Sequence, residues 1–527
     1  MTMSCSSIHP EDGCTLCFQL SLLAKLMNDS YNEQLRLSER HLRFDVSALK
    51  NVIASLSGRV PSDIVTFSKL SEGRFNRVFQ IYFKDGQCVF ARLPYPSTTP
   101  EHYTLASEVA TLDYLRLHGI PTPKLYAWCS TKANPVGSEY IIMEKLSGIP
   151  LGDVWYSMTP KEHHKMMKKI VHREAQLMSL NFPAHGSIYH CKDLTSEKKI
   201  PLPGQKDVEF CIGPSSHYSW WHDGRNTLDI DRGPWLSPTD IFRAVGEREL
   251  CWTKTYAKPR LPYERLYREV YNFCKVSPDT HIRSLSDYMK LVPFLGFSAR
   301  TALHRPVMRH PDFQPNNILV SKSNEIVGFI DWQHSSILPL GLCSWNTETL
   351  PELRRQYVRL CKRGWFISLY AAFTRRLNED HYDAIYDNSA ILHQRHFTSI
   401  GTSWEGVSTT LRADIIRAMQ SCRDLIATDS VPPTRGITPL PPVQYSDKVV
   451  QDTLDLDSRQ READIAMEQM RHALGVDVLG RVPNGEYEAA KELAEEMKAR
   501  MLEATKTAHD ITEVRHHFPF DDFDEDA

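Results

Sequence analysis

The chain has 527 residues, of which 41% are hydrophobic and 24% are charged. Its 62 basic and 65 acidic side chains give a formal net charge of −3, so no overall basic field attracts it to nucleic acid. This composition excludes collagen-like, repeat-rich and mostly disordered chains, and the length allows two or more domains. We therefore expect a globular protein with a sizeable core.

The cysteines and the N-terminal segment carry weak signals. The twelve cysteines are scattered singly except for Cys14 and Cys17, and one such pair favours a loop coincidence over a zinc or redox site. The apolar stretch 14–27 is interrupted by polar residues and is shorter than the roughly 18–20 residues that a spanning helix needs. Acidic residues precede the first arginine, Arg36, so the N-terminal composition favours the cytosol over a mitochondrial presequence.

The first third of the chain predicts a helical arm followed by a small antiparallel sheet with one helix. The arm covers residues 1–60 and the sheet lies within 61–147. Asp85-Gly86 separates two aromatic and β-branched runs, which is a strong hairpin signal. The predicted elements are strands over 78–83, 88–93 and 139–144, and a helix over 100–118 that ends at Gly119.

The pattern becomes helical over residues 148–430. Thr159 and Glu162 form a capping box with Pro160 in the first turn, which predicts a helix from there to about Leu180. We expect the lysines of this helix to form its solvated face; they are Lys161, Lys165, Lys168 and Lys169. Further helices are predicted over 237–256, 261–275, 282–294, 351–376 and 407–425.

Two other segments are read from composition. Residues 186–235 are rich in loops, and we expect their three tryptophans to pack in the core or against loops rather than to form a stacking platform for substrate; these are Trp220, Trp221 and Trp235. Residues 431–527 combine a proline-rich connector, helices with a break near 482–485, and an acidic tail over 516–526. The tail is expected to be disordered, and the alternative is that it docks on this chain or on a partner.

The chemistry is concentrated in two short strands that each end in acidic or amide side chains, within residues 305–335. Asp312, five residues before Asn317, can place a base beside a metal ligand, and Asp331 can bring another hard oxygen to the same place. Hard oxygens suit Mg²⁺, which few protein groups usually hold together with substrate phosphates. Each aspartate alone could cap a loop, but together with the amide they favour a nucleotide–metal site for phosphoryl transfer.

The pattern H-x-D-x-x-x-x-N followed by I-D-W resembles the catalytic and metal loops of the aminoglycoside phosphotransferase branch of the kinase-like fold. The chain is also similar to the fungal phosphotransferase-domain proteins called altered inheritance of mitochondria proteins. That likeness rests on residues 70–77, 91–96, 106–111 and 330–334 and on the acidic ending. It implies a two-lobed, protein-kinase-like α+β fold with a small antiparallel β N-lobe and a larger, mainly helical C-lobe, located in the mitochondrion.

The same resemblance assigns roles to individual residues. Asp312 would orient the acceptor hydroxyl or accept its proton, and His310 would support the loop through hydrogen bonds. Asn317 and Asp331 would hold Mg²⁺ against the phosphates of ATP. The remaining nucleotide-binding residues would be Ser71, Gly73 and Asn76 of the nucleotide loop, Arg92 paired with Glu108, and the hinge from Met143 to Lys145.

The chain departs from the family pattern in three places, one of which is Phe313-Gln314, where antibiotic kinases more usually have Leu and His. Its nucleotide loop has one glycine where kinases have three, so phosphate binding would rely more on Ser71 and Asn76. Arg92 stands where kinases usually have lysine, and its bulkier fork puts catalytic strength in doubt more than nucleotide binding. Alternatively, Arg92 is a solvated strand residue and Glu108 an ordinary surface acid.

We therefore expect an ATP-dependent phosphotransferase that moves the γ-phosphoryl group to a hydroxyl on a small molecule or a protein, with a link to mitochondrial maintenance. The alternative is a nucleotide-binding pseudo-enzyme or scaffold that acts through its helical C-terminal region. About 160 residues separate Gly148 from His310, and this excess is expected to shape the acceptor pocket. No nucleic-acid partner and no membrane span are expected, and the acidic tail has a partner in the docking alternative.

Overall fold

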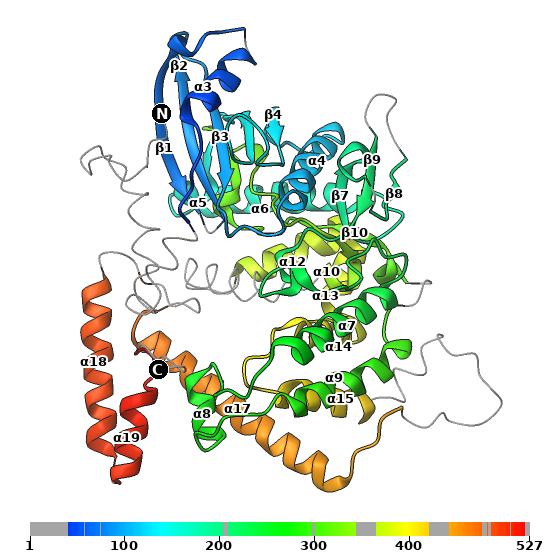
Figure 1. Ribbon diagram of the computed structural model, residues 1–527, viewed down its shortest axis with the longest axis vertical. Helices are drawn as coiled ribbons and strands as arrows, with labels where there is room; N and C mark the ends of the chain where they lie inside the picture. Colours follow the sequence, from blue (N-terminus) through cyan, green and yellow to red (C-terminus); the bar gives the residue numbers. More distant parts are fainter. Residues whose placement is uncertain are drawn as a thin grey trace, which may run out of the picture.

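The computed structural model describes residues 40–56, 58–73, 75–195, 197–203, 209–297, 301–343, 365–420, 442–476, 482, 486–505 and 507–521. The Cys14–Cys17 pair and the proline-rich connector up to residue 441 lie outside this range. The described chain forms two lobes, with the β-rich lobe above and the helical lobe below in Figure 1. Among the described helices, none combines the length and the apolar character that crossing a membrane would require.

The upper lobe is a five-stranded antiparallel sheet in the order β1-β2-β3-β5-β4. Alternate residues of β2, among them Phe79 and Ile81, are buried against Leu49 and Ile53 of α3. The predicted hairpin is confirmed, because β2 pairs with β3 and Gly86 takes the left-handed φ of 82° that its turn requires. The elements are α3 (Val46–Ser55), β1 (Ile64–Glu72), β2 (Asn76–Phe83), β3 (Cys88–Pro94), α4 (Tyr103–Leu117), β4 (Leu125–Cys129) and β5 (Tyr140–Glu144).

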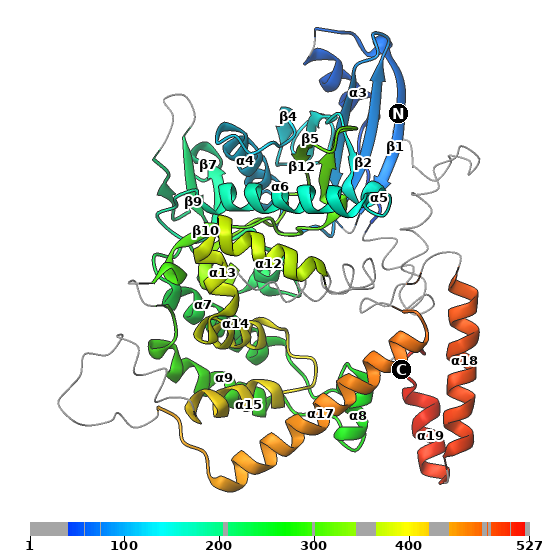
Figure 2. The same cartoon turned by 180° about the vertical axis from the view of Figure 1, so that it is seen from behind.

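The lower lobe begins with a long helix, α6, that runs beneath the sheet (Figure 2). The capping box is confirmed: the Thr159 hydroxyl accepts from the Glu162 amide, and the Glu162 carboxylate accepts from the Thr159 amide. A three-stranded sheet, β7-β9-β8, follows in the region that was predicted to be loops. The prediction missed these strands because each has only two to four residues. These elements are β6 (Ile149–Pro150), α5 (Leu151–Trp155), α6 (Pro160–Met178), β7 (Ser187–His190), β8 (Ile200–Pro201) and β9 (Phe210–Gly213).

The base of the molecule is helical. The predicted helix over 261–275 is shorter than expected, because Asn272 and Phe273 adopt left-handed backbone conformations that stop it. Trp220 and Trp235 are buried in the core of this region, as predicted. The helices are α7 (Pro238–Tyr256), α8 (Arg265–Val270), α9 (Asp279–Leu291), α10 (Leu340–Cys343), α12 (Trp365–Leu377), α13 (Glu379–Tyr386), α14 (Asn388–Gly401), α15 (Thr409–Gln420), α17 (Asp447–Ala473), α18 (Tyr487–Ala504) and α19 (Ala508–His517).

Four short strands carry and support the loops of interest. The β11–β12 hairpin pairs antiparallel, and β6 extends it on the other side of β11. A second ladder joins β10 to β13. The strands are β10 (Pro306–Met308), β11 (Ile318–Val320), β12 (Ile326–Phe329) and β13 (Ile337–Pro339).

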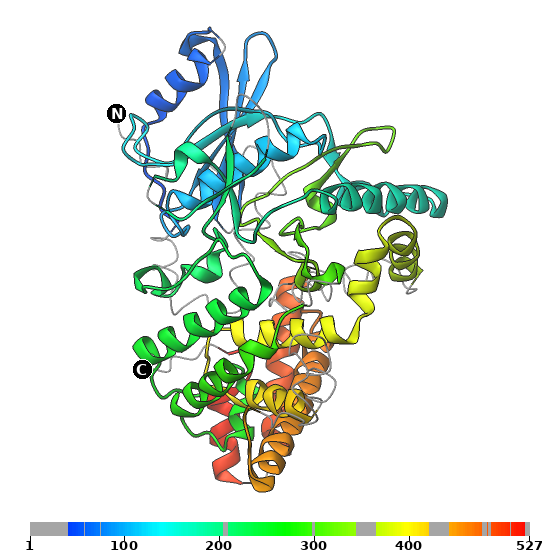
Figure 3. The same cartoon turned by 90° about the vertical axis from the view of Figure 1, so that its right-hand side faces the viewer.

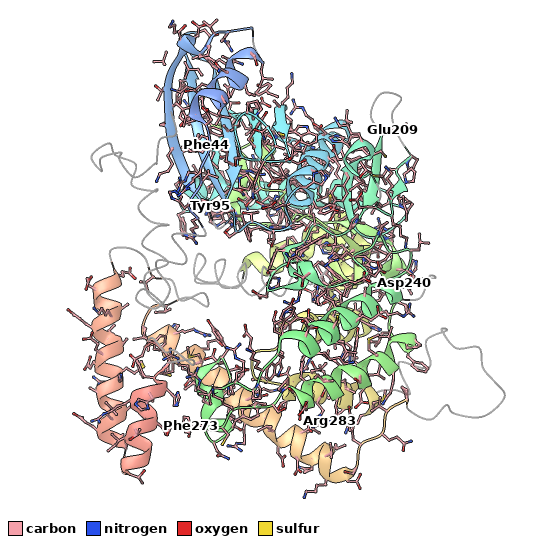
Figure 4. The ribbon with its side chains drawn as sticks, in the orientation of Figure 1. Phe44, Tyr95, Glu209, Asp240, Phe273 and Arg283 are labelled. Carbon is pink, nitrogen blue, oxygen red and sulfur yellow. The ribbon has the colours of Figure 1, made fainter. Side chains whose placement is uncertain are left out.

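The expectation of a disordered tail is wrong for residues 516–521, and the docking alternative holds for them. Phe518 is 2% exposed, and its carbonyl accepts a hydrogen bond of 2.6 Å from Arg265 on α8. The ring of His517 stacks on Phe273, which Figure 4 places beside α8. Asp521 forms an ion pair with Lys498 on α18. The tail docks because the Phe518 ring is buried and the Asp521 carboxylate pairs with the Lys498 ammonium group.

Replacing Thr159 tests the capping box. The Thr159→Ala variant should lower the free energy of unfolding by about 1 kcal/mol, because the first turn of α6 loses a side-chain acceptor. Urea unfolding followed by circular dichroism measures the change, and Thr159→Ser is the matched control that keeps the hydroxyl. Equal losses in both variants would contradict a capping role.

Candidate active site

A buried ion pair joins β3 to α4 at the lower edge of the sheet. Arg92 donates from its guanidinium to the Glu108 carboxylate, and their side chains are 11% and 2% exposed. Burial raises the pKa of Glu108, and the Arg92 charge opposes that shift. The alternatives of a solvated Arg92 and a surface Glu108 are therefore wrong.

Arg92 also reaches the loop that follows β12 in the lower lobe. Its Nη1 lies 4.0 Å from Oδ1 of Asp331, whose side chain is half exposed between the lobes. Asp331 has a φ of 66°, a left-handed conformation that is uncommon for a residue with a side chain. Partial enclosure raises the pKa of Asp331, and Arg92 opposes this shift. One guanidinium thus contacts carboxylates from both lobes.

His310 ties this loop to the loop that carries Asp312. Its Nδ1 accepts the backbone N–H of Asp312 at 3.1 Å, so its Nε2–H donates to the Ile330 carbonyl at 2.9 Å. The ring is 2% exposed and packs on Trp332 at a centroid distance of 4.4 Å. Burial lowers the pKa of His310 to about 4, so the imidazole is neutral at pH 7. The loops on which Asp312 and Asp331 lie are therefore held as one unit.

Two amides hold the Asp312 carboxylate. Gln314 donates from Nε2 to Oδ2 of Asp312 at 2.6 Å, and Asn317 donates from Nδ2 to the same oxygen at 3.0 Å. Asn317 also donates to the Asp312 carbonyl at 2.9 Å, and its own carbonyl accepts from Ile330 at 3.0 Å. Because the amide nitrogen of Asn317 is used on Asp312, its side-chain oxygen is the atom that it could offer to a cation.

The turn between β1 and β2 bends toward the same place. Asn76 donates from Nδ2 to Oε1 of Gln333 at 2.5 Å, and the ring of Phe75 meets His334 edge-on at 4.9 Å. The N–H of Tyr95, which lies at the boundary between the lobes in Figure 4, donates to the Phe75 carbonyl at 2.9 Å. Gln333 was missed as a site residue, although the polar side chain two positions after Asp331 was a usable signal.

Four residues that were predicted to bind the nucleotide make no contact with Arg92, Glu108 or Asp331 among the contacts described above. Ser71 is partly buried in β1, opposite Val78, and Gly73 donates to the Asn76 carbonyl at 2.9 Å. Met143 pairs with Phe90 in the sheet. Lys145 is exposed, and its ammonium group lies 3.1 Å from the Tyr82 hydroxyl. No contact in the structure tests their proposed roles toward a nucleotide.

The donor set suits a magnesium ion better than a metal held by the protein alone. Among the described residues, no group of three or more His, Cys, Asp or Glu side chains is arranged to hold a metal. Asp331 contributes a carboxylate and Asn317 an amide oxygen, both hard ligands. Mg²⁺ is commonly bound through one or two carboxylates together with substrate phosphates. The residues present therefore fit a Mg²⁺–nucleotide complex.

The loop that carries Asp312 has a second support that the sequence did not reveal. Arg309 donates from Nε to Glu174 of α6 at 3.1 Å, and the Tyr370 hydroxyl of α12 donates to the same carboxylate at 2.6 Å. These partners are 135 and 196 residues apart in the chain, so no local pattern could pair them. They fix the residue that precedes His310.

Comparisons with known proteins identify a family. Residues 66–360 match the model of the family described as phosphotransferase enzymes. A subtelomeric hrmA-associated cluster protein of Aspergillus fumigatus is 29% identical over 493 residues, which cover 82% of this chain and 92% of that protein. Altered inheritance of mitochondria protein 9, mitochondrial, of Kluyveromyces lactis is 25% identical over 371 residues, which cover 61% of this chain and 58% of that protein.

Among solved structures, an ethanolamine kinase of Plasmodium vivax aligns with a TM-score of 0.35 at 13% identity, covering 87% of this chain and 96% of that one.

Removing one partner of the buried pair should lower the free energy of unfolding more than replacing both partners. Glu108→Ala leaves the Arg92 guanidinium buried without its partner, so we expect a loss of about 3–5 kcal/mol in the free energy of unfolding. The double variant Arg92→Met/Glu108→Leu should unfold at higher urea than Glu108→Ala. A double variant that is no more stable would contradict the buried character of the pair.

The neutral state of His310 gives a pH-dependent prediction. Its folded pKa of about 4 lies below the unfolded value of 6.5, so its contribution is complete above pH 6.5 and is lost as pH falls toward 4. The lost part amounts to about 3 kcal/mol. His310→Gln lacks this titration, so its stability deficit against the wild type should narrow between pH 7 and pH 4.5 in urea unfolding. A deficit that stays constant with pH would show that the imidazole is not held neutral.

Proposed function

The chain belongs to the phosphotransferase enzyme family, and on that premise we propose that it transfers the γ-phosphoryl group of ATP to a hydroxyl acceptor. The observation that carries the proposal is the His310 bridge. It holds the Asp312 loop and the Asp331 loop together at the edge of the β lobe, where Arg92 is already paired with Glu108. Phosphoryl transfer depends mainly on positioning and charge neutralisation, and this arrangement can supply both.

Asp312 is the group that faces the acceptor in this proposal. It orients the hydroxyl for in-line attack and takes the proton as the new O–P bond forms and the bond from Pγ to the ADP oxygen breaks. The amide donors of Gln314 and Asn317 hold the carboxylate in one rotamer. The acceptor is a small molecule or a protein side chain.

Asn317 and Asp331 are the residues that would hold Mg²⁺. When bound, the ion supplies charge neutralisation at the phosphate oxygens. Arg92 adds a permanent positive charge 4.0 Å from Asp331, and Glu108 keeps its guanidinium in place. Because a guanidinium can donate to two oxygens at once, Arg92 can replace the usual lysine as a phosphate contact.

One observation favours a second candidate, a nucleotide-binding scaffold without turnover that acts through the helical C-terminal region. The bond between Asn76 and Gln333 and the contact of Phe75 with His334 fold the nucleotide loop onto the metal loop. ATP would have to displace this loop before its phosphates reach Asp331. A protein that binds nucleotide but never releases ADP in the presence of any hydroxyl would fit this candidate.

We also propose a mitochondrial location. Its support is the similarity to proteins named altered inheritance of mitochondria protein 9, mitochondrial, at 25–26% identity. Fractionation of cells that express the tagged full-length chain tests it, with recovery in the mitochondrial fraction as the expected result. Recovery in the cytosol alone would contradict it.

Calorimetry and turnover separate the candidate functions. Mg-ATP should bind the wild type, and Asp331→Asn should weaken binding at least tenfold, since a ligand of the ion is lost. Asp312→Asn should keep the affinity but lower ATP turnover by about 10²–10⁴-fold, the usual range for a lost general base. Asp383→Asn, a change at an exposed acid on α13, is the control and should alter neither quantity.

The outcomes are distinct. Binding without turnover in the wild type, whatever hydroxyl is offered, would favour the scaffold. A wild type that binds no Mg-ATP would contradict both candidates.

A further inference from the structure

The solvent-facing line of α6 is basic over its first four turns. Lys161, Lys165, Lys168 and His172 are all exposed, and their spacing of three and four residues places them on one face. The opposite face is buried in the core through Met166, Met167, Ile170, Val171, Glu174, Leu177 and Met178. The fold of α6 therefore depends on the apolar face and makes no use of the basic one.

The sign and position of these charges lower the stability of the helix. Cations near a helix N-terminus oppose the macrodipole, and like charges three or four residues apart repel each other. The neighbouring acids serve other groups: Glu162 caps Thr159, and Glu325 accepts from Lys169 at 2.7 Å. The row of lysines is solvent-exposed and so is accessible to an anionic surface outside the fold.

The surface continues beyond the helix. Lys322 is exposed on the β11–β12 turn, and Lys169 donates to the Asn324 carbonyl of that turn at 2.8 Å, which fixes it beside α6. Two apolar side chains precede the helix in the same part of the lobe, with Tyr156 70% exposed and Ile149 45% exposed. Figure 3 shows α6 projecting from the body of the molecule. We call these residues the α6 patch: Ile149, Tyr156, Lys161, Lys165, Lys168, His172 and Lys322.

We propose that the α6 patch docks on the surface of an anionic phospholipid bilayer. Lysines near such a surface are attracted by its negative potential, and several in a row add their contributions. Tyr156 and Ile149 supply the apolar contact with the headgroup region that an interfacial segment needs. A nucleic-acid backbone would use the lysines but would leave Ile149 without a role, so the combination of cation and apolar side chains favours lipid.

This docking bears on the candidate active site without depending on its chemistry. Helix α5, which lies between Ile149 and Tyr156, packs against the catalytic loop: a Cβ on Gly152 would come within 2.0 Å of the Asn316 side chain. A bilayer on the α6 patch would therefore lie close behind that loop. The proposal concerns the resting protein and needs neither ATP nor an acceptor.

Vesicle sedimentation with the full-length chain tests the proposal. The wild type should pellet with vesicles of phosphatidylcholine and phosphatidylserine but not with phosphatidylcholine alone, and high salt should weaken binding. Each lysine near the surface is worth roughly fivefold in partitioning, so Lys161→Gln/Lys165→Gln/Lys168→Gln should lower it about a hundredfold. Tyr156→Ser should lower it by a smaller factor.

The matched control makes the same change of charge elsewhere. Lys254→Gln/Lys258→Gln/Lys275→Gln alters three exposed lysines outside the α6 patch and should sediment like the wild type. Circular dichroism verifies that both triple variants are folded. The proposal is overturned if the wild type does not bind anionic vesicles or if the control loses as much binding as the patch variant. Binding of duplex DNA or polyglutamate as tight as binding of the vesicles would also overturn it.

Discussion

The neutral imidazole of His310 is the contact on which the candidate site depends. Its two ring nitrogens accept from the Asp312 N–H and donate to the Ile330 carbonyl, 20 residues beyond His310 along the chain. A lysine would only donate, and a carboxylate would only accept. Burial keeps the ring uncharged, so the bridge holds the loops of Asp312 and Asp331 together without adding a charge beneath them.

Around this bridge, charge is arranged in opposed pairs. Above it, Arg92 is neutralised by Glu108 in the upper lobe and extends to Asp331 in the lower one. Behind it, Arg309 is neutralised by Glu174 on the inner face of α6. Helix α6 therefore has two distinct faces, since its inner face supports the Asp312 loop through Glu174 and its outer face carries exposed lysines.

Local pattern predicted much of the fold, and the family resemblance named site residues whose roles toward a nucleotide stay predictions. The β2–β3 hairpin, the α6 capping box and the helix over α4 follow from neighbouring residues and are present as predicted. The contacts that the sequence did not reveal join distant segments. Asn76 and Gln333 are 257 residues apart in the chain, and Arg265 and Phe518 are 253 residues apart. The β7-β9-β8 sheet was not predicted, because its strands are too short to show an alternation of apolar and polar side chains. Hydrogen-bond pairing between the strands stabilises them instead.

The most direct test is a crystal structure of the full chain with Mg²⁺ and a non-hydrolysable ATP analogue. We predict that oxygens of Asn317 and Asp331 hold the ion, that the phosphates lie beside Arg92, and that the nucleotide loop has moved away from Gln333. A nucleotide bound away from Arg92 and Asp331, or an ion held by neither Asn317 nor Asp331, would contradict the proposed site.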